Sequence, residues 1–103
     1  MTKFVFIFYG TGAPDISYDA LNAAVGDWFR KLGGKVVDGG NPFKATARSV
    51  TTKGVSEIGQ SAASGYTVIE CNTLEEAVEL AKLCPLVKHF ANGAVQVYEA
   101  TSM

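Results

Sequence analysis

The stretch from Gly65 to Pro85 constrains the fold most, because it encodes a strand, a turn and a helix in succession. Residues 66–71 are a short apolar, β-branched run, which predicts a strand inside a sheet. Thr73 and Glu76 have the spacing of a capping box, which predicts the start of a helix. We expect this helix to end before Pro85, because proline has no amide hydrogen to donate.

The remaining segments predict three more strands, a hairpin and one long helix. The long helix carries a broad apolar stripe that includes Trp28, with Asp15 or Ser17 as its cap. Lys53 and Gly54 are expected to form the hairpin turn, and residues 84–92 an irregular link. The expected order is strand, helix, strand, hairpin, strand, helix and strand, over residues 3–9, 18–32, 35–38, 46–58, 66–71, 74–83 and 94–100.

This order predicts an α+β, ferredoxin-like antiparallel sheet with two helices on one face. The strands at 3–9 and 66–71 are apolar on both faces, yet two helices can cover only one. A large uncovered apolar face is uncommon on a monomer. We therefore expect a homodimer that buries this sheet face against a second copy.

Composition narrows the function classes. The 103 residues suit a single domain spanning 1–103, and a net charge of −1 argues against a general nucleic-acid binder. No run approaches the roughly 20 apolar residues of a membrane span, and residues 1–10 suit a strand better than a signal peptide. Cys71 and Cys84 lack metal-ligand spacing and are expected to be buried free thiols in a cytoplasmic protein. We expect neither a metal nor another cofactor.

Several segments together resemble one family. They are the runs GYTVIEC at 65–71, LEEAVELA at 74–81, Cys84-Pro85, GAVQVY at 93–98 and VVDGGNPF at 36–43. This combination is similar to the YCII-related domain family, particularly its small bacterial members, over nearly the whole chain. The resemblance implies the dimeric α+β barrel, an architecture also found in muconolactone isomerases and cofactor-independent monooxygenases. Function does not follow from the fold alone.

Some relatives pair a histidine near the first helix with an aspartate just before the proline that follows the second helix. This chain has no histidine in its first helix, and Cys84 stands before Pro85. The acid–base role of that dyad therefore does not transfer to these positions.

The turn after the expected strand at 35–38 contains the first candidate site residues. Asp38 follows a strand and precedes two glycines, so its carboxylate could face a pocket as a base, with its pKa raised by desolvation. The alternative, which we favour, is an Asx-type turn in which Asp38 or Asn41 binds nearby amides. Asn41 is also a candidate ligand-binding residue.

Polar residues on the strands offer a second set. Arg48 could hold a carboxylate or phosphate, or could lie on a solvated strand face. Tyr66 and Glu70 share one strand face, as do Gln96 and Tyr98, and these four could line a ligand site or a dimer interface.

His89 is the single histidine, and its unperturbed pKa lies near neutrality, which suits acid–base catalysis. Its place on a link beside Lys88 instead favours a solvent-exposed residue.

Two functions remain open. The first is a dimer that binds a small aromatic or acidic metabolite in a pocket. The second is a cofactor-independent enzyme, an isomerase or a monooxygenase-like catalyst, with Asp38 or His89 as base and Arg48 holding an anionic group. No nucleophile–base pair or dinucleotide loop is visible in the sequence, so we favour binding and leave catalysis undecided.

Overall fold

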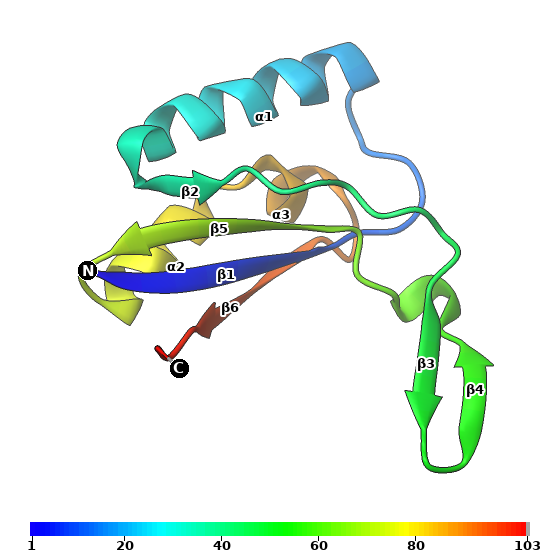
Figure 1. Cartoon of the computed structure of the whole chain (residues 1–103). Coiled ribbons are helices and arrows are strands. Elements are labelled where there is room, and N and C mark those ends of the chain that lie inside the picture. Colours follow the sequence, from blue (N-terminus) through cyan, green and yellow to red (C-terminus); the bar gives the residue numbers. More distant parts are fainter. Residues whose placement is uncertain (103) are drawn as a thin grey trace.

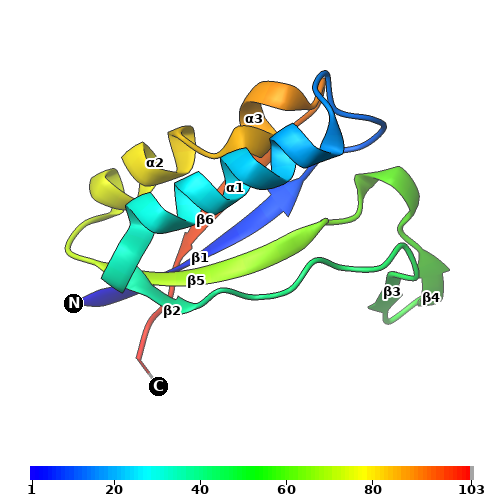
Figure 2. The same ribbon diagram turned by 90° about the horizontal axis from the view of Figure 1, so that it is seen from above.

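The computed structural model describes residues 1–102. A four-stranded antiparallel sheet forms one layer, and helices cover one of its faces (Figures 1 and 2). The elements in chain order are β1 (Thr2–Tyr9), α1 (Tyr18–Leu32), η1 (Gly33–Lys35), β2 (Val36–Asp38), β3 (Arg48–Thr51), β4 (Gly54–Glu57), η2 (Gly59–Ser61), β5 (Gly65–Cys71), α2 (Leu74–Lys82), α3 (Pro85–His89) and β6 (Ala94–Glu99).

The strand order β2-β5-β1-β6 gives the ferredoxin-like arrangement that the sequence predicted. β1 lies in the centre and pairs antiparallel with both β5 and β6. β3 and β4 form a separate two-stranded sheet, which is inserted between β2 and β5 in the chain. Within residues 1–102, no helix is long and apolar enough to cross a membrane.

The core lies between the sheet and the helices. Alternate residues of β1 supply Phe4, Phe6 and Phe8, each at most 7% exposed, because successive strand residues point to opposite faces. Trp28 of α1 packs on Phe6 and Phe8, and its indole Nε1 donates to the Leu80 carbonyl of α2 at 2.9 Å. The indole therefore ties both helices to the central strand.

Local signals explain where the two longer helices begin and end. Ser17 caps α1, because its hydroxyl accepts from the Ala20 amide at 3.1 Å, and Gly33 ends it with a φ of 55°. Thr73 caps α2 by accepting from the Glu76 amide at 3.1 Å, as predicted. The Glu76 carboxylate reaches the Asn72 amide at 3.0 Å, one residue before the expected partner.

Two local predictions were wrong. The segment after α2 is not wholly irregular, because Pro85 begins the short helix α3. The end of α2 at Lys82, before Pro85, agrees with the prediction. Proline is favoured at the first position of a helix, where its missing amide hydrogen costs nothing. In the hairpin, Thr51 pairs with Gly54, so Thr52 and Lys53 form the turn rather than Lys53 and Gly54.

Both cysteines are free and almost fully buried, as the sequence predicted. Burial raises the pKa of Cys84 to about 11. Burial, followed by the nearby Glu76 carboxylate, raises the pKa of Cys71. Both thiols therefore stay protonated at neutral pH, which removes the nucleophilic thiolate.

Within residues 1–102, no element covers the sheet face opposite the helices. It presents the alternate residues of β1, β5 and β6, in cross-strand rows that the strand register defines. One row joins Tyr66, Ile7 and Gln96, and the next joins Val68, Val5 and Tyr98. We call this surface the open sheet face.

Candidate functional site

A cleft of about 360 Å³ lies between α1 and one end of the sheet. Apolar side chains from three elements line it, namely Phe8, Val25, Phe29 and Leu86. Polar residues complete the lining, namely Asn22, Asn41, Ser64 and Thr67, together with Gly39, Gly40, Pro42, Gly65 and Tyr66. The volume falls within the range of about 300–1,000 Å³ that is typical of small-molecule sites.

The loop after β2 forms one wall of this cleft and is firmly held. Gly40 donates its amide to the Asp38 carboxylate at 2.8 Å, which is the Asx-type turn that the sequence favoured. The Thr67 hydroxyl donates to the Gly39 carbonyl at 3.0 Å. Farther along, Phe43 donates its amide to the Ser64 carbonyl at 2.9 Å. The wall is therefore formed before any ligand arrives.

The residues that line the cleft are uncharged. Asn22 and Asn41 offer amide groups, Ser64 offers a hydroxyl, and the glycine-rich loop offers backbone groups, whereas the buried Thr67 hydroxyl is already bound to Gly39. Phe8 and Phe29 contribute aromatic rings. This combination suits a small molecule with a flat apolar body and a few uncharged polar groups.

Of the predicted site residues, the structure brings Asn41 and Tyr66 to this cleft, although the strand register places the Tyr66 side chain on the open sheet face. The Tyr66 ring stacks on Phe43 at a centroid distance of 5.8 Å, and its hydroxyl donates to Asp38 at 3.3 Å. Asp38 is exposed, and both of its carboxylate oxygens accept hydrogen bonds within the chain. Burial therefore does not desolvate this carboxylate, contrary to the pocket interpretation.

Three other candidates lie on the open sheet face. Gln96 accepts from the hydroxyls of Tyr98 at 2.8 Å and Tyr9 at 3.3 Å. Glu70 lies opposite Lys3 in the strand register, on the same face. The sequence correctly placed Glu70, Gln96 and Tyr98 on one face, which is separate from the cleft.

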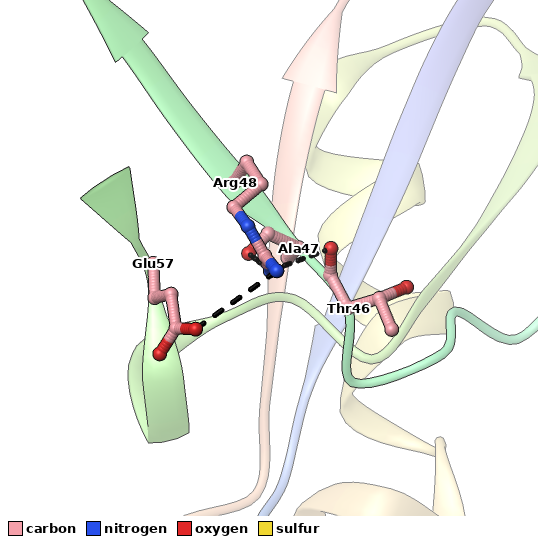
Figure 3. A network of polar contacts seen from close by, with 4 residues as sticks. All are labelled: Thr46, Ala47, Arg48 and Glu57. Carbon is pink, nitrogen blue, oxygen red and sulfur yellow. Dashed lines mark hydrogen bonds and ion pairs between the residues drawn. The ribbon is translucent and has the colours of Figure 1, made fainter. Parts of the chain in front are cut away.

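Arg48 lies on the β3–β4 hairpin, away from both the cleft and the open sheet face. Its guanidinium donates to the carbonyls of Thr46 and Ala47, each at 3.1 Å, and lies 3.9 Å from the Glu57 carboxylate (Figure 3). These contacts are exposed and local. Within one chain, Arg48 does not join the cleft residues.

His89 is paired, which the sequence did not predict. Its Nδ1 lies 2.8 Å from Asp15 Oδ1, and its carbonyl accepts from the Asp15 amide at 2.9 Å. The side chain is 27% exposed rather than fully exposed. Ser17 caps α1, so the Asp15 side chain is left to bind the histidine. Sequence spacing gave no signal, since 74 positions separate the two residues.

Asn22 and Ser64 were also missed as cleft residues. Asn22 is exposed on α1 and resembles any polar residue on the wet side of a helix. Ser64 belongs to a small polar segment with no motif. Among the described residues, no three histidine, cysteine or acidic side chains gather as metal ligands would.

Comparison with known proteins adds information on the fold. No protein-family model and no curated protein sequence matches this chain. Among solved structures, it is similar to 5-chloro-2-hydroxyhydroquinone dehydrochlorinase (TftG) from Burkholderia phenoliruptrix AC1100, in complex with 2,5-dihydroxybenzoquinone. The TM-score is 0.64 at 16% identity, covering 98% of this chain and 95% of that one.

At this identity the similarity establishes the α+β fold and nothing finer. The dimeric α+β barrel that the sequence resemblance implied stays a prediction. Placement in the YCII-related family stays a prediction.

Proposed function

We propose that this protein binds a small, flat, uncharged aromatic molecule in the cleft between α1 and the sheet. The observation that carries the proposal is the lining, in which aromatic and aliphatic side chains surround a few uncharged polar groups. Of the two ligand classes that the sequence left open, an aromatic ligand fits this lining better than an acidic one. A buried carboxylate would need a cationic partner there.

The structural neighbour TftG was solved with 2,5-dihydroxybenzoquinone, a planar six-membered ring with hydroxyl and carbonyl groups. Each of its hydroxyls is conjugated to a carbonyl and ionises at neutral pH, so that ligand itself does not suit an uncharged cleft. Hydroquinone is the better first probe, because it is planar, aromatic and uncharged at neutral pH, and its hydroxyls can bind amides and hydroxyls.

We also propose that the working form is a homodimer through the open sheet face. Val5, Ile7 and Val68 lie there beside tyrosine side chains, and tyrosine is enriched in protein interfaces. This arrangement gives Gln96 and Tyr98 an interface role instead of a ligand role.

Replacing Asn22 with tryptophan should abolish binding of hydroquinone. The added indole would occupy the cleft from an exposed position of α1, so the fold should be retained. The matched control is Ala23→Trp, also exposed on α1 but outside the cleft lining. Isothermal titration calorimetry should show heat of binding for wild type and Ala23→Trp, and none for Asn22→Trp.

Equal binding by the two tryptophan variants would place the ligand elsewhere. If wild type binds neither this probe nor any neutral aromatic in a thermal-shift panel, the binding proposal fails.

Catalysis is a second candidate function, and the His89–Asp15 pair favours it. A carboxylate on Nδ1 orients an imidazole and leaves Nε2 to exchange a proton with a substrate. His89 lies one helical turn beyond Leu86, which lines the cleft. Asp38 is the weaker candidate, because its carboxylate already holds the turn.

Under this second proposal, His89→Gln should lower turnover by roughly 100-fold or more, the usual contribution of a general base. The reaction to assay is chloride release from 5-chloro-2-hydroxyhydroquinone, followed with a chloride electrode. Lys88→Gln, an exposed neighbour on α3, is the control and should retain wild-type turnover. Chloride release by wild type at the rate without protein would exclude this reaction.

A further inference from the structure

The β3–β4 hairpin projects away from the rest of the molecule. In both views it extends on the opposite side of the main sheet from the helices (Figures 1 and 2). Its two strands pair with each other and, within residues 1–102, with no strand of the main sheet. A lone two-stranded hairpin is marginally stable in water, so a supporting surface is expected. We call residues 48–57 the arm.

One face of the arm is apolar at its centre. Val50 and Val55 lie directly opposite each other in the register and are 76% and 69% exposed. Arg48 and Glu57 share this face at the base of the arm. The other face carries small polar residues, including the opposed pair Ser49 and Ser56. The arm is therefore two-sided, with a valine face and a serine face.

The open sheet face alone is small for a stable dimer. β1, β5, β6 and β2 have 8, 7, 6 and 3 residues. At ~3.3 Å per residue and ~4.8 Å between strands, the sheet covers a flat area of roughly 400 Å². A standard interface buries about 800 Å² on each partner. A dimer built from this sheet therefore needs additional contact area, and the arm extends toward the side from which a second copy would approach.

We propose that the valine face of the arm packs against a second copy of this chain. The inference rests on the proposed homodimer and extends it from a sheet-to-sheet contact to a contact with two arms. Two-fold symmetry places each arm on the other copy, so both valine pairs are covered at once. The contact also supplies the surface that each hairpin lacks in its own chain.

The arm is also continuous with the cleft wall. Asn41 and Pro42 lead into the arm, Ser64 and Gly65 follow it, and all four line the cleft. The two segments bind each other there, through a β-bridge between Pro42 and Gly65. The segments that form the cleft wall therefore also set the direction in which the arm leaves the main sheet.

Sedimentation velocity of the full chain without ligand tests the arm directly. Val50→Lys/Val55→Lys should raise the dimer Kd by at least about tenfold, because charges would replace a desolvated apolar contact. Ser49→Lys/Ser56→Lys is the matched control, with the same added charge at an opposed pair on the other face. Its dimer Kd should stay within about twofold of wild type, as expected away from an interface core.

Val50→Thr/Val55→Thr is a second variant that should keep the hairpin folded, because threonine is also β-branched and keeps strand propensity. This variant should weaken the dimer to an intermediate degree. A wild-type monomer at micromolar concentration, or equal dimer Kd values for the valine and serine variants, would overturn the proposal. The cleft test with Asn22→Trp is independent, so failure of the arm and failure of ligand binding are distinguishable.

Discussion

Replacing Trp28 with alanine is expected to lower the free energy of unfolding by about 3–5 kcal/mol, as for other large-to-small aromatic replacements in cores. The side chain is only 3% exposed. Its ring lies 6.0 Å from Phe6, 5.8 Å from Phe8 and 5.3 Å from Phe29, measured between centroids. Removing it leaves a cavity where α1, α2 and the central strand meet.

The matched control is Tyr18→Ala, which removes an aromatic ring from the same helix at a position that is 61% exposed. Its effect should stay within about 0.5 kcal/mol. Trp28→Phe keeps an aromatic ring but loses the Nε1 bond to Leu80, and should cost about 1–2 kcal/mol.

Urea denaturation followed by far-UV circular dichroism measures all three variants, because the fluorescence of the single tryptophan is lost with Trp28. A loss below about 1 kcal/mol for Trp28→Ala would contradict a core centred on this residue.

Gly40→Ala is expected to cost about 3 kcal/mol or more. Gly40 has a φ of 75°, and an added Cβ would lie 1.7 Å from the Tyr66 carbonyl oxygen. The backbone cannot easily move away, because its neighbours on both sides are tied to β5. Thr67 binds the Gly39 carbonyl, and the Tyr66 amide binds the Asn41 carbonyl. The variant should also distort the cleft wall.

Alanine variants of two other glycines separate the steric clash of the added Cβ from the cost of a positive φ. Gly39→Ala adds a Cβ with no atom within 4 Å and without a positive φ, so stability should change by less than about 1 kcal/mol. Gly59→Ala has a φ of 74° but open space, and should cost only the roughly 1–2 kcal/mol of the left-handed conformation. Thermal and urea unfolding of the three variants gives the comparison. Equal losses for Gly40→Ala and Gly59→Ala would show that the steric clash is relieved.

The local elements were predictable because their signals lie within a few residues. The alternation along residues 3–9 predicted a strand with Phe4, Phe6 and Phe8 on one face, and the structure shows that this face is the buried one. The capping box of Thr73 and Glu76 fixed the start of α2. The hairpin turn was misplaced by one residue, because either neighbouring pair containing Lys53 could form it and only the strand register distinguishes them.

The candidate site was harder to predict, because its residues come from distant parts of the chain. Asn22, Asn41 and Ser64 meet only where α1 lies across the end of the sheet. Asp38 could have been a buried base or a turn residue, and its exposure and hydrogen bonds decide for the turn. The pairing of His89 with Asp15 depends on how α3 packs beside the start of α1.

The sequence by itself determined the four strands of the main sheet, the two longer helices, the ferredoxin-like arrangement and the apolar residues on both faces of β1 and β5. These follow from short-range periodicity, capping and the rules that connect successive elements. Only the tertiary structure decided where the cleft lies, which polar residues enter it and on which side of the sheet the arm projects. Those features depend on contacts between distant segments, whose geometry is set by side-chain packing rather than by spacing along the chain.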